Sequence, residues 1–288
     1  CAAVCPLGAV QDVVALRPLR VPGWLEAALG LLPYVYLALA ALLAAVGGAW
    51  VICRFDPFVG LFRLSATTGM IVVAACVLAI GVFVARPYCR FLCPYGALLQ
   101  IFSRLSWRHV TITPAECVNC RLCEDTCPFG AIDLPTPVPS APRRSEGKGL
   151  LAGMLALLPV WVAAGALAGA ALAWPLAQTH RTVALARLVR QEQQAGVSGQ
   201  TFETWAFAQA GGDVEQLEAD ADAVVDRLRA GGWWFGGFVG LVIALKLVSL
   251  SVRRTREHHV PDRARCLSCG RCFAACPIEQ RRRHRHPR

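Results

Sequence analysis

The chain has 288 residues, of which 56% are hydrophobic and 17% are charged, and its formal net charge is +10. This composition excludes an ordinary soluble globular protein and is typical of a membrane protein. Its 14 cysteines would suit a secreted disulfide scaffold, but long apolar runs and repeated cysteine motifs instead indicate thiols kept reduced on the cytoplasmic side of a membrane. Because the chain opens on Cys1 rather than Met, we expect a processed or truncated piece with a further domain upstream.

The first segment, CAAVCPLGAVQ at residues 1–11, returns as CRFLCPYGALLQ at residues 89–100. Both copies contain C-x3-C-P followed by x-G-A, so we expect an internal duplication in which each copy resembles half of a ferredoxin motif. Pro6 and Pro94 suit the first turn of a helix, whose N–H groups would favour thiolates at the preceding cysteines. Four thiols are therefore expected either to hold a further metal or cluster or to form two redox-active or structural pairs: Cys1, Cys5, Cys89 and Cys93.

Long apolar runs follow each other along the chain and predict an all-α polytopic membrane protein. Four of them can cross a hydrocarbon core of roughly 30 Å; they are residues 27–49, 67–85, 149–177 and 233–252. Small-residue spacings, Gly165 with Gly169 and Gly236 with Gly240, would let the third and fourth helices pack closely.

Most Lys and Arg residues lie in three segments, residues 1–22, 86–148 and 253–288. Successive crossings place all three segments on one face, and the positive-inside rule assigns that face to the cytoplasm. We therefore expect a multi-pass protein of the bacterial inner membrane with a cytoplasmic C-terminus. The opposite face would hold a loop at residues 50–66 and a helical segment at residues 178–232.

The loop at residues 53–68 mixes Phe55, Phe58 and Phe62 with charged side chains. Such a loop could seat a quinone ring, and the alternative is that the aromatic side chains anchor it at the membrane interface. The Ser-Ala-Thr-Thr sequence at residues 65–68, which ends the loop, is interpreted as the N-cap of the next helix.

The most specific signal is the motif C-x2-C-x2-C-x3-C-P, which occurs at residues 117–128 and again at residues 266–277. Bacterial ferredoxins use this spacing to bind 4Fe–4S clusters, and in two-cluster proteins the fourth cysteine of each motif ligates the other cluster. Zinc is the alternative, but zinc sites usually pair two C-x2-C knuckles with no proline after the last ligand. The crossed rule predicts one cluster held by Cys117, Cys120, Cys123 and Cys276, and another held by Cys266, Cys269, Cys272 and Cys127. Two cysteines remain outside every motif, Cys53 and Cys76, and are expected to be small core residues.

These patterns divide the chain into four parts. They are a membrane domain at residues 1–110, a first ferredoxin half at 111–148, a helix pair with its extracytoplasmic segment at 149–252, and a second ferredoxin half with a basic tail at 253–288. Because two crossings separate the motifs, both halves are expected on the same face, where they would assemble into one cytoplasmic two-cluster module.

Together, C-x3-C-P pairs beside transmembrane helices and a ferredoxin motif pair resemble the membrane polyferredoxins of the NosR/NapH type. The C-x3-C-P cysteines are similar to the membrane cysteines of that family, and the cysteines of the two ferredoxin motifs are similar to its cluster ligands. It implies electron transfer between cytoplasmic clusters, the quinone pool and a respiratory or maturation partner, with other redox subunits and a flavin-binding domain or subunit upstream. Two departures are that the flavin domain of NosR is not in this chain and that a helix pair separates ferredoxin halves that NapH keeps adjacent.

We expect an electron-transfer subunit rather than a stand-alone enzyme. Other functions remain open. One is a quinol dehydrogenase component, another a metal-ion reductase for oxidase assembly, and a third a redox-sensing or assembly scaffold in the membrane. The basic C-terminal sequence RRRHRHPR is interpreted as a solvated or lipid-binding tail, so no nucleic-acid partner is expected.

Overall fold

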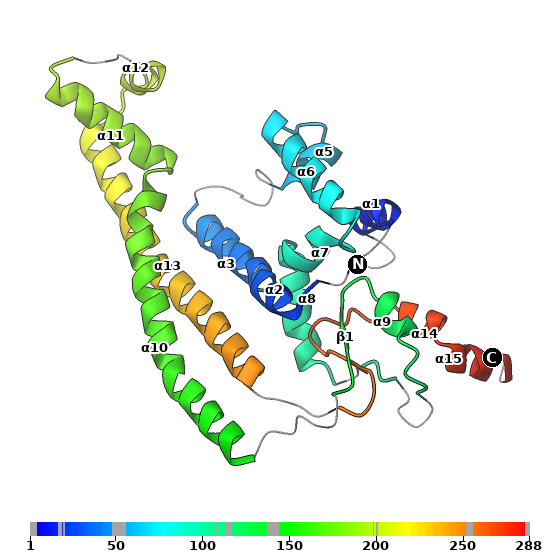
Figure 1. The fold of residues 1–288 in the computed structure, drawn as a ribbon. Helices are drawn as coiled ribbons and strands as arrows, with labels where there is room; N and C mark the ends of the chain where they lie inside the picture. The colour runs from blue at the N-terminus through cyan, green and yellow to red at the C-terminus, as the bar shows by residue number, and fades with distance from the viewer. Residues whose placement is uncertain are drawn as a thin grey trace. The chain divides into compact units, whose positions relative to one another are not determined.

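The computed structural model describes residues 5–16, 19, 21–47, 56–107, 109–112, 117–136, 144–197, 199, 201–251 and 256–285. It is mostly helical (Figure 1) and divides into two compact units. The first unit holds Cys1–Leu37, Phe55–Leu151 and Leu250–Arg288, and the second holds Ala38–Arg54 and Ala152–Ser249. Cys1, Cys53 and Phe55 lie outside the described residues, so the predictions made for them stay predictions.

Short helices make up most of the first unit. They are α1 (Pro6–Val14), α2 (Gly23–Leu29), α5 (Pro57–Phe62), α6 (Thr68–Gly81), α7 (Pro87–Phe91), α8 (Pro94–Leu105), α9 (Leu122–Asp125), α14 (Arg271–Ala275) and α15 (Pro277–Arg285). Pro6 and Pro94 each stand in the first turn of a helix, as predicted, because that position needs no backbone N–H. The predicted cap of α6 is confirmed as well, since the Thr67 hydroxyl accepts a hydrogen bond from the Met70 N–H at 3.4 Å.

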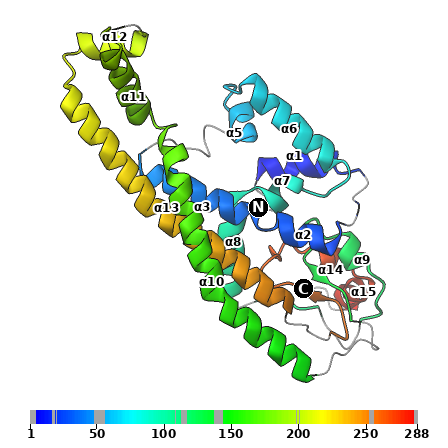
Figure 2. The same cartoon turned by 60° about the vertical axis from the view of Figure 1, so that its left-hand side comes forward.

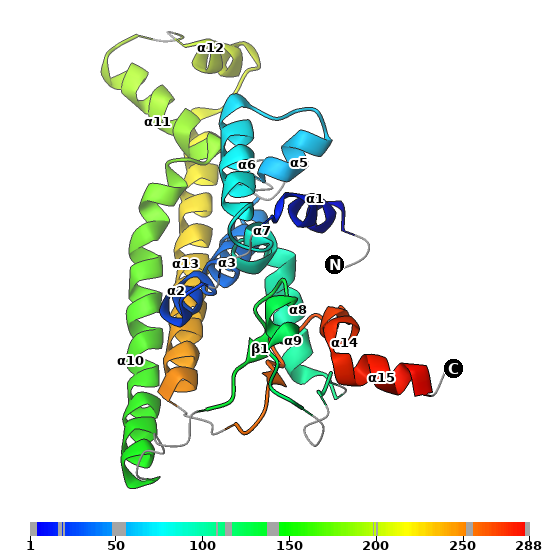
Figure 3. The ribbon, with the colours of Figure 1, turned by 45° about the vertical axis from the view of Figure 1, so that its right-hand side comes forward.

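A small antiparallel sheet joins the segments that carry the two cysteine motifs. Its strands are β1 (Ile132–Asp133) and β2 (Val260–Pro261), and Ile132 pairs with Pro261. The pairing extends past the strand end, because the Asp262 N–H donates to the Ala131 carbonyl at 2.7 Å. The segment after the first motif therefore lies beside the segment before the second, as Figure 3 shows near α9 and α14.

Close helix packing dominates the second unit, where α10 (Arg144–Ala177) and α13 (Val214–Ser251) run antiparallel (Figure 2). An alanine Cβ at Gly165 would collide with the carbonyl oxygen of Gly236, and one at Gly169 would collide with the carbonyl oxygen of Gly232. Another at Gly240 would meet the Trp161 carbonyl. The predicted close approach of these helices through small residues is confirmed.

Two further helices, α11 (Arg181–Gln194) and α12 (Phe202–Gln209), connect α10 to α13. The core of this unit is apolar, with Ala177, Val183, Val224 and Leu228 among its buried residues. The apolar stripe from Val214 onward is not a separate extracytoplasmic helix, because α13 continues without a break into the predicted fourth span.

Within the described part of the chain, three helical stretches are long and apolar enough to cross a membrane: Gly23–Ala45, which contains α2 and α3 (Leu32–Ala45), Lys148–Ala177 and Val214–Ser251. The predicted span at residues 67–85 is shorter, since α6 has only 14 residues. At 1.5 Å per residue it is about 21 Å long, less than a hydrocarbon core of roughly 30 Å. The prediction of four spans is therefore not confirmed.

The loop before α6 also differs from the prediction. Asp56 and Phe58 are buried, and the Tyr88 hydroxyl donates a hydrogen bond to the Asp56 carboxylate. Phe58 packs edge-on against Tyr88 with ring centroids 4.9 Å apart. These contacts hold the described start of the loop beside Tyr88, so Phe58 is unavailable as an interfacial anchor or a quinone seat. Cys76 is exposed rather than part of the core.

Candidate functional site

Cysteines from both motifs line one small cavity. Cys127 of the first motif lies there with three cysteines of the second, Cys266, Cys269 and Cys272. The wall between them is mostly apolar and includes Phe129, Ala131 and Ile132. The Ala131 N–H also points to the Cys127 sulfur at 3.4 Å. These four cysteines are the set that the crossed rule predicts for one cluster.

Left-handed backbone turns shape the cysteine loops. Asn119 (φ 52°), Arg121 (φ 64°), Ser268 (φ 51°) and Gly270 (φ 77°) stand between the first three cysteines of their motifs. Arg121 and Gly270 are the residues directly before α9 and α14, so each loop turns sharply and then starts a helix. Residues other than glycine adopt this conformation at a cost, which is typical of functional sites where the surrounding structure maintains it.

The first three cysteines of the first motif also share one environment. Burial raises the pKa of the Cys123 thiol, and the neighbouring charges of Cys117 and Cys120 raise it further against the hydrogen bond from the Glu124 N–H. Cys276 directly follows the last residue of α14. This helix packs against α9, which contains Cys123. The assignment of Cys276 as the fourth ligand of this set stays a prediction.

No three Cys, His, Asp or Glu side chains among the described residues converge tightly enough to hold a single metal ion. A 4Fe–4S cluster does not require such convergence, because each of its four thiolates binds a different iron atom. The cavity with its four cysteines, its apolar walls and its N–H donor to sulfur fits a cluster of this kind.

Three of the four C-x3-C-P cysteines come together near α1, α7 and α8. Burial raises the pKa of Cys89 to about 11, the Gln11 amide lowers it through a hydrogen bond at 3.3 Å, and the charges of Cys93 and Cys5 raise it again. Burial likewise raises the pKa of Cys93, although the N–H groups of Gly96 and Tyr95 lower it. The predicted preference for thiolate is therefore wrong at Cys93, the cysteine directly before α8, because desolvation outweighs the N–H groups there.

Buried polar side chains that sequence reasoning missed surround these cysteines. Gln11 is fully buried, donates to Cys89 and accepts a hydrogen bond from the Tyr88 N–H at 3.1 Å. Arg86 is 1% exposed and donates twice to the Asp12 carboxylate, at 2.6 and 2.5 Å. The repeat offered a signal for Gln11, since each copy ends in glutamine, whereas nothing in the sequence marked Arg86 or Asp12.

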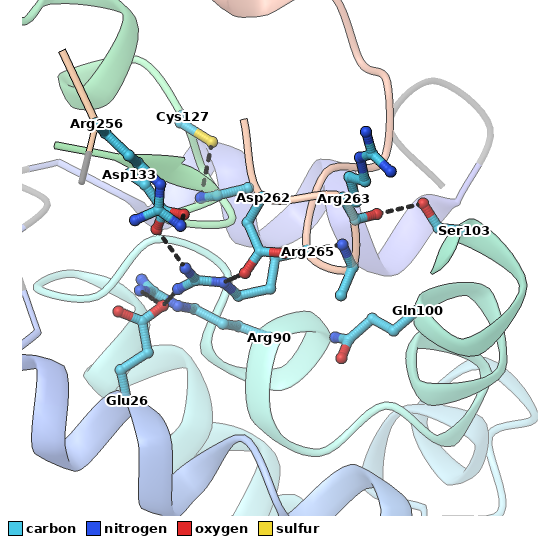
Figure 4. Close-up of polar contacts among 12 residues, drawn as sticks. Glu26, Arg90, Gln100, Ser103, Cys127, Asp133, Arg256, Asp262, Arg263 and Arg265 are labelled. Atoms are coloured by element: carbon cyan, nitrogen blue, oxygen red, sulfur yellow. Dashed lines mark hydrogen bonds and ion pairs between the residues drawn. The ribbon is translucent and has the colours of Figure 1, made fainter. Parts of the chain in front are cut away.

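An ionic network connects α2 and α7 to both motif segments (Figure 4). Arg265 donates to Asp262 at 2.7 Å, to Asp133 at 3.0 Å and to Glu26 at 2.6 Å. Arg90 of α7 also pairs with Glu26, at 2.6 Å. Because Asp133 follows the first motif and Asp262 precedes the second, Arg265 holds the two segments to each other and to α2.

A more open cleft of about 390 Å³ lies between α8 and the start of the second motif. Its lining combines the apolar Phe102 and Leu267 with the polar His109 and Arg263, and it includes Cys266. Cys266, a predicted cluster ligand, thus forms part of the wall of this cleft.

Two family models match the chain, and both are described as a 4Fe-4S binding domain. One matches residues 1–25 and 66–113, which contain the C-x3-C-P cysteines, and the other matches residues 110–133, which contain the first ferredoxin motif. Neither match extends to the motif at residues 266–277.

Curated proteins are similar to a little under half of the chain. Protein NirI of Paracoccus denitrificans is 34% identical over 145 residues, which are 46% of this chain and 21% of that protein. The putative electron transport protein YccM of Escherichia coli is 28% identical over 145 residues, 44% of this chain and 40% of that protein. The regulatory protein NosR of Stutzerimonas stutzeri is 29% identical over 148 residues, 46% of this chain and 20% of that protein.

The chain spans between 20% and 40% of the length of these three relatives. No solved structure matches it. The matches to two 4Fe-4S binding domain models, the apolar helices and these relatives support the resemblance seen in the sequence, and the chain is similar to 4Fe–4S membrane proteins of the NosR/NapH type.

Proposed function

We propose that this protein passes electrons between two 4Fe–4S clusters on the cytoplasmic side of the bacterial inner membrane, the quinone pool and a respiratory or maturation partner. The observation that carries the proposal is the single cavity lined by Cys127 with Cys266, Cys269 and Cys272. Four cysteines from two motifs with ferredoxin spacing supply the thiolates that one 4Fe–4S cluster needs, which supports a shared cluster.

The protein would contribute to this function by holding and insulating the clusters. A bound 4Fe–4S cluster supplies reversible one-electron transfer. The thiolates bind iron, the apolar residues Phe129 and Ile132 keep water away, and the Ala131 N–H stabilises charge on the Cys127 sulfur. The other cluster would be held by Cys117, Cys120, Cys123 and Cys276.

A further metal or cluster at the C-x3-C-P cysteines is part of the proposal. Cys5 lies close enough to Cys89 and Cys93 for its charge to raise the pKa of both thiols, and Cys1 would be the fourth ligand. The match of a 4Fe-4S binding model to the segments that carry these cysteines supports this assignment. Such a centre would connect the membrane helices to the clusters.

The proposed orientation rests on the helix pair between the two motifs. Because α10 and α13 run antiparallel and both are long enough to span a membrane, a chain that crosses along both would return to the face from which it left. The basic segments 86–148 and 253–288 favour the cytoplasm for that face. Other redox subunits, and a flavin-binding domain or subunit upstream, would complete the chain of carriers.

Redox sensing is the second candidate function, because one relative is named a regulatory protein. The name of YccM, a putative electron transport protein, favours steady electron flow. Adding a quinol to membranes separates the two functions. We expect cluster reduction within the turnover time of respiration, whereas clusters that stay oxidised under these conditions would exclude exchange with the quinone pool.

The cluster assignment is tested on anaerobically purified full-length protein. Cys127→Ala should lose the signal of the cluster held with Cys266, and Cys276→Ala should lose the signal of the other cluster. Iron, acid-labile sulfide and electron paramagnetic resonance spectra would be compared with those of Cys76→Ala, a control outside all motifs. If Cys127→Ala instead damages only the cluster of its own motif, the crossed assignment is wrong.

A further inference from the structure

Arg86 lies between the C-x3-C-P cysteines and the cavity that contains Cys127. It directly precedes α7, the helix that carries Cys89. Its guanidinium carbon lies 5.2 Å from the ring centroid of Phe129, and Phe129 lines the cavity two residues after Cys127. One buried cation thus adjoins both cysteine sites.

The charge on Arg86 is only partly balanced. Asp12 accepts both hydrogen bonds from Arg86, but the same carboxylate also accepts one from Arg271, which lines the cavity. Two guanidinium groups therefore share one carboxylate, and the group carries a net positive charge. Hydrogen bonding to Arg86 keeps the pKa of Asp12 below its usual value, so this carboxylate is ionised at neutral pH.

The backbone at Arg86 indicates that its side chain is needed there. Its φ is 49°, a left-handed conformation that glycine adopts without steric cost and that arginine does not. A strained residue of this kind persists where the surrounding contacts determine its position. Here those contacts are the Asp12 carboxylate and the Phe129 ring.

Electrostatics gives a second connection to the two sites. The pKa of Arg86 is raised, first by the hydrogen bond to Asp12 and further by the charges of Cys89 and Cys269. Negative charge at either position, Cys89 or Cys269, would therefore act on the same guanidinium.

We propose that Arg86, positioned by Asp12, is a residue that raises the reduction potential of the cluster held by Cys127 and the second motif. This inference rests on the proposed function, because it requires that cluster. Reduction adds one electron, and hence one negative charge, to the cluster. A buried positive charge nearby stabilises the reduced form more than the oxidised form, because the low dielectric of the interior strengthens the attraction.

Redox titration of the full-length protein, followed by electron paramagnetic resonance, tests the inference through the midpoint potential rather than through activity. Arg86→Gln should shift the potential to lower values, because one positive charge is lost. Asp12→Asn should shift it to higher values, because one negative charge is lost. Arg86→Lys, which retains the charge, should stay closest to wild type. The control Arg190→Gln breaks an exposed ion pair of the second unit, with Glu218, and should shift nothing.

The opposite signs separate this role from a structural one. Arg86→Gln and Asp12→Asn break the same ion pair, so a merely structural effect would move the potential in the same direction or abolish the signal in both variants. Shifts of equal sign, or none, overturn the inference. If Arg86→Gln loses its iron, the test rests on Asp12→Asn alone. A higher midpoint potential in that variant supports the inference, and an unchanged or lower one overturns it. A wild-type protein without the cluster signal would instead overturn the proposed function, and this inference with it.

Discussion

Replacing Gly165 by Ala should force α10 and α13 apart. The new Cβ would lie 3.0 Å from the Cα of Gly240 and 3.1 Å from the carbonyl carbon of Gly236, besides colliding with the Gly236 oxygen. Carbon atoms prefer separations of roughly 3.5–4.0 Å, and backbone atoms cannot move aside as a flexible side chain can. Overpacking of this kind costs about 1–3 kcal/mol, whereas alanine in place of glycine gains about 0.8–1.0 kcal/mol of helix propensity.

The net expectation is a loss of about 1 kcal/mol in the free energy of unfolding. Gly153→Ala is the matched control, since it changes the same helix at a position where a Cβ would meet nothing within 4 Å. It should be neutral or slightly stabilising. Both variants can be unfolded by titrating dodecyl sulfate into mild detergent while tryptophan fluorescence is recorded. Equal midpoints for the two variants would refute the argument that backbone contact limits the approach of these helices.

Four more predictions concern three residues of the first unit. Arg265→Gln should destabilise the protein by about 1–3 kcal/mol, because the carboxylates of Glu26, Asp133 and Asp262 each lose one partner. The melting temperature measures this loss. Breaking the exposed ion pair of Arg190 is the control and should change the melting temperature little. Tyr88→Phe should cost about 1–3 kcal/mol in chemical denaturation, since Asp56 is 4% exposed and loses a donor; a wild-type midpoint would show that water replaces the hydroxyl. In metal-free protein, Cys89 should be alkylated by iodoacetamide with a midpoint near pH 11, because only the thiolate reacts and burial raises its pKa to about 11. The ordinary pKa of a cysteine thiol is 9.0, so between pH 9.0 and about 11 the unfolded chain loses the Cys89 proton before the folded protein does. The free energy of unfolding of the metal-free protein should therefore fall over this pH range. Cys89→Ser should lack this fall.

Local spacing explains which features the sequence predicted. The ferredoxin motifs, the helix starts at Pro6 and Pro94, and the glycine contacts of α10 all depend on residues a few positions apart, whose geometry a helix or a tight turn fixes. The same holds for the cap at Thr67. Spacing could also predict that Cys127 meets the second motif, because the ferredoxin rule already contains a crossing.

Pairings between distant single residues were not predictable. Arg86 and Asp12 lie 74 positions apart, and Tyr88 and Asp56 lie 32 apart, with no periodic pattern around either pair. Hydropathy likewise overestimated the span at residues 67–85, because it counts apolar residues beyond Gly81 that the structure places in turns. An apolar run shows that a segment avoids water, but the helix length depends on where the backbone turns.

The helix pair between the two motifs has a consequence for how the protein is made. The ribosome synthesises Cys127 before α10 and α13, and it synthesises Cys266 only after both. On the proposed ligand set, the scaffold that delivers iron and sulfide meets an incomplete site until this hairpin has entered the bilayer and the last motif has been translated. Maturation of this cluster would therefore report successful membrane insertion, and a chain whose hairpin fails to insert would remain without it.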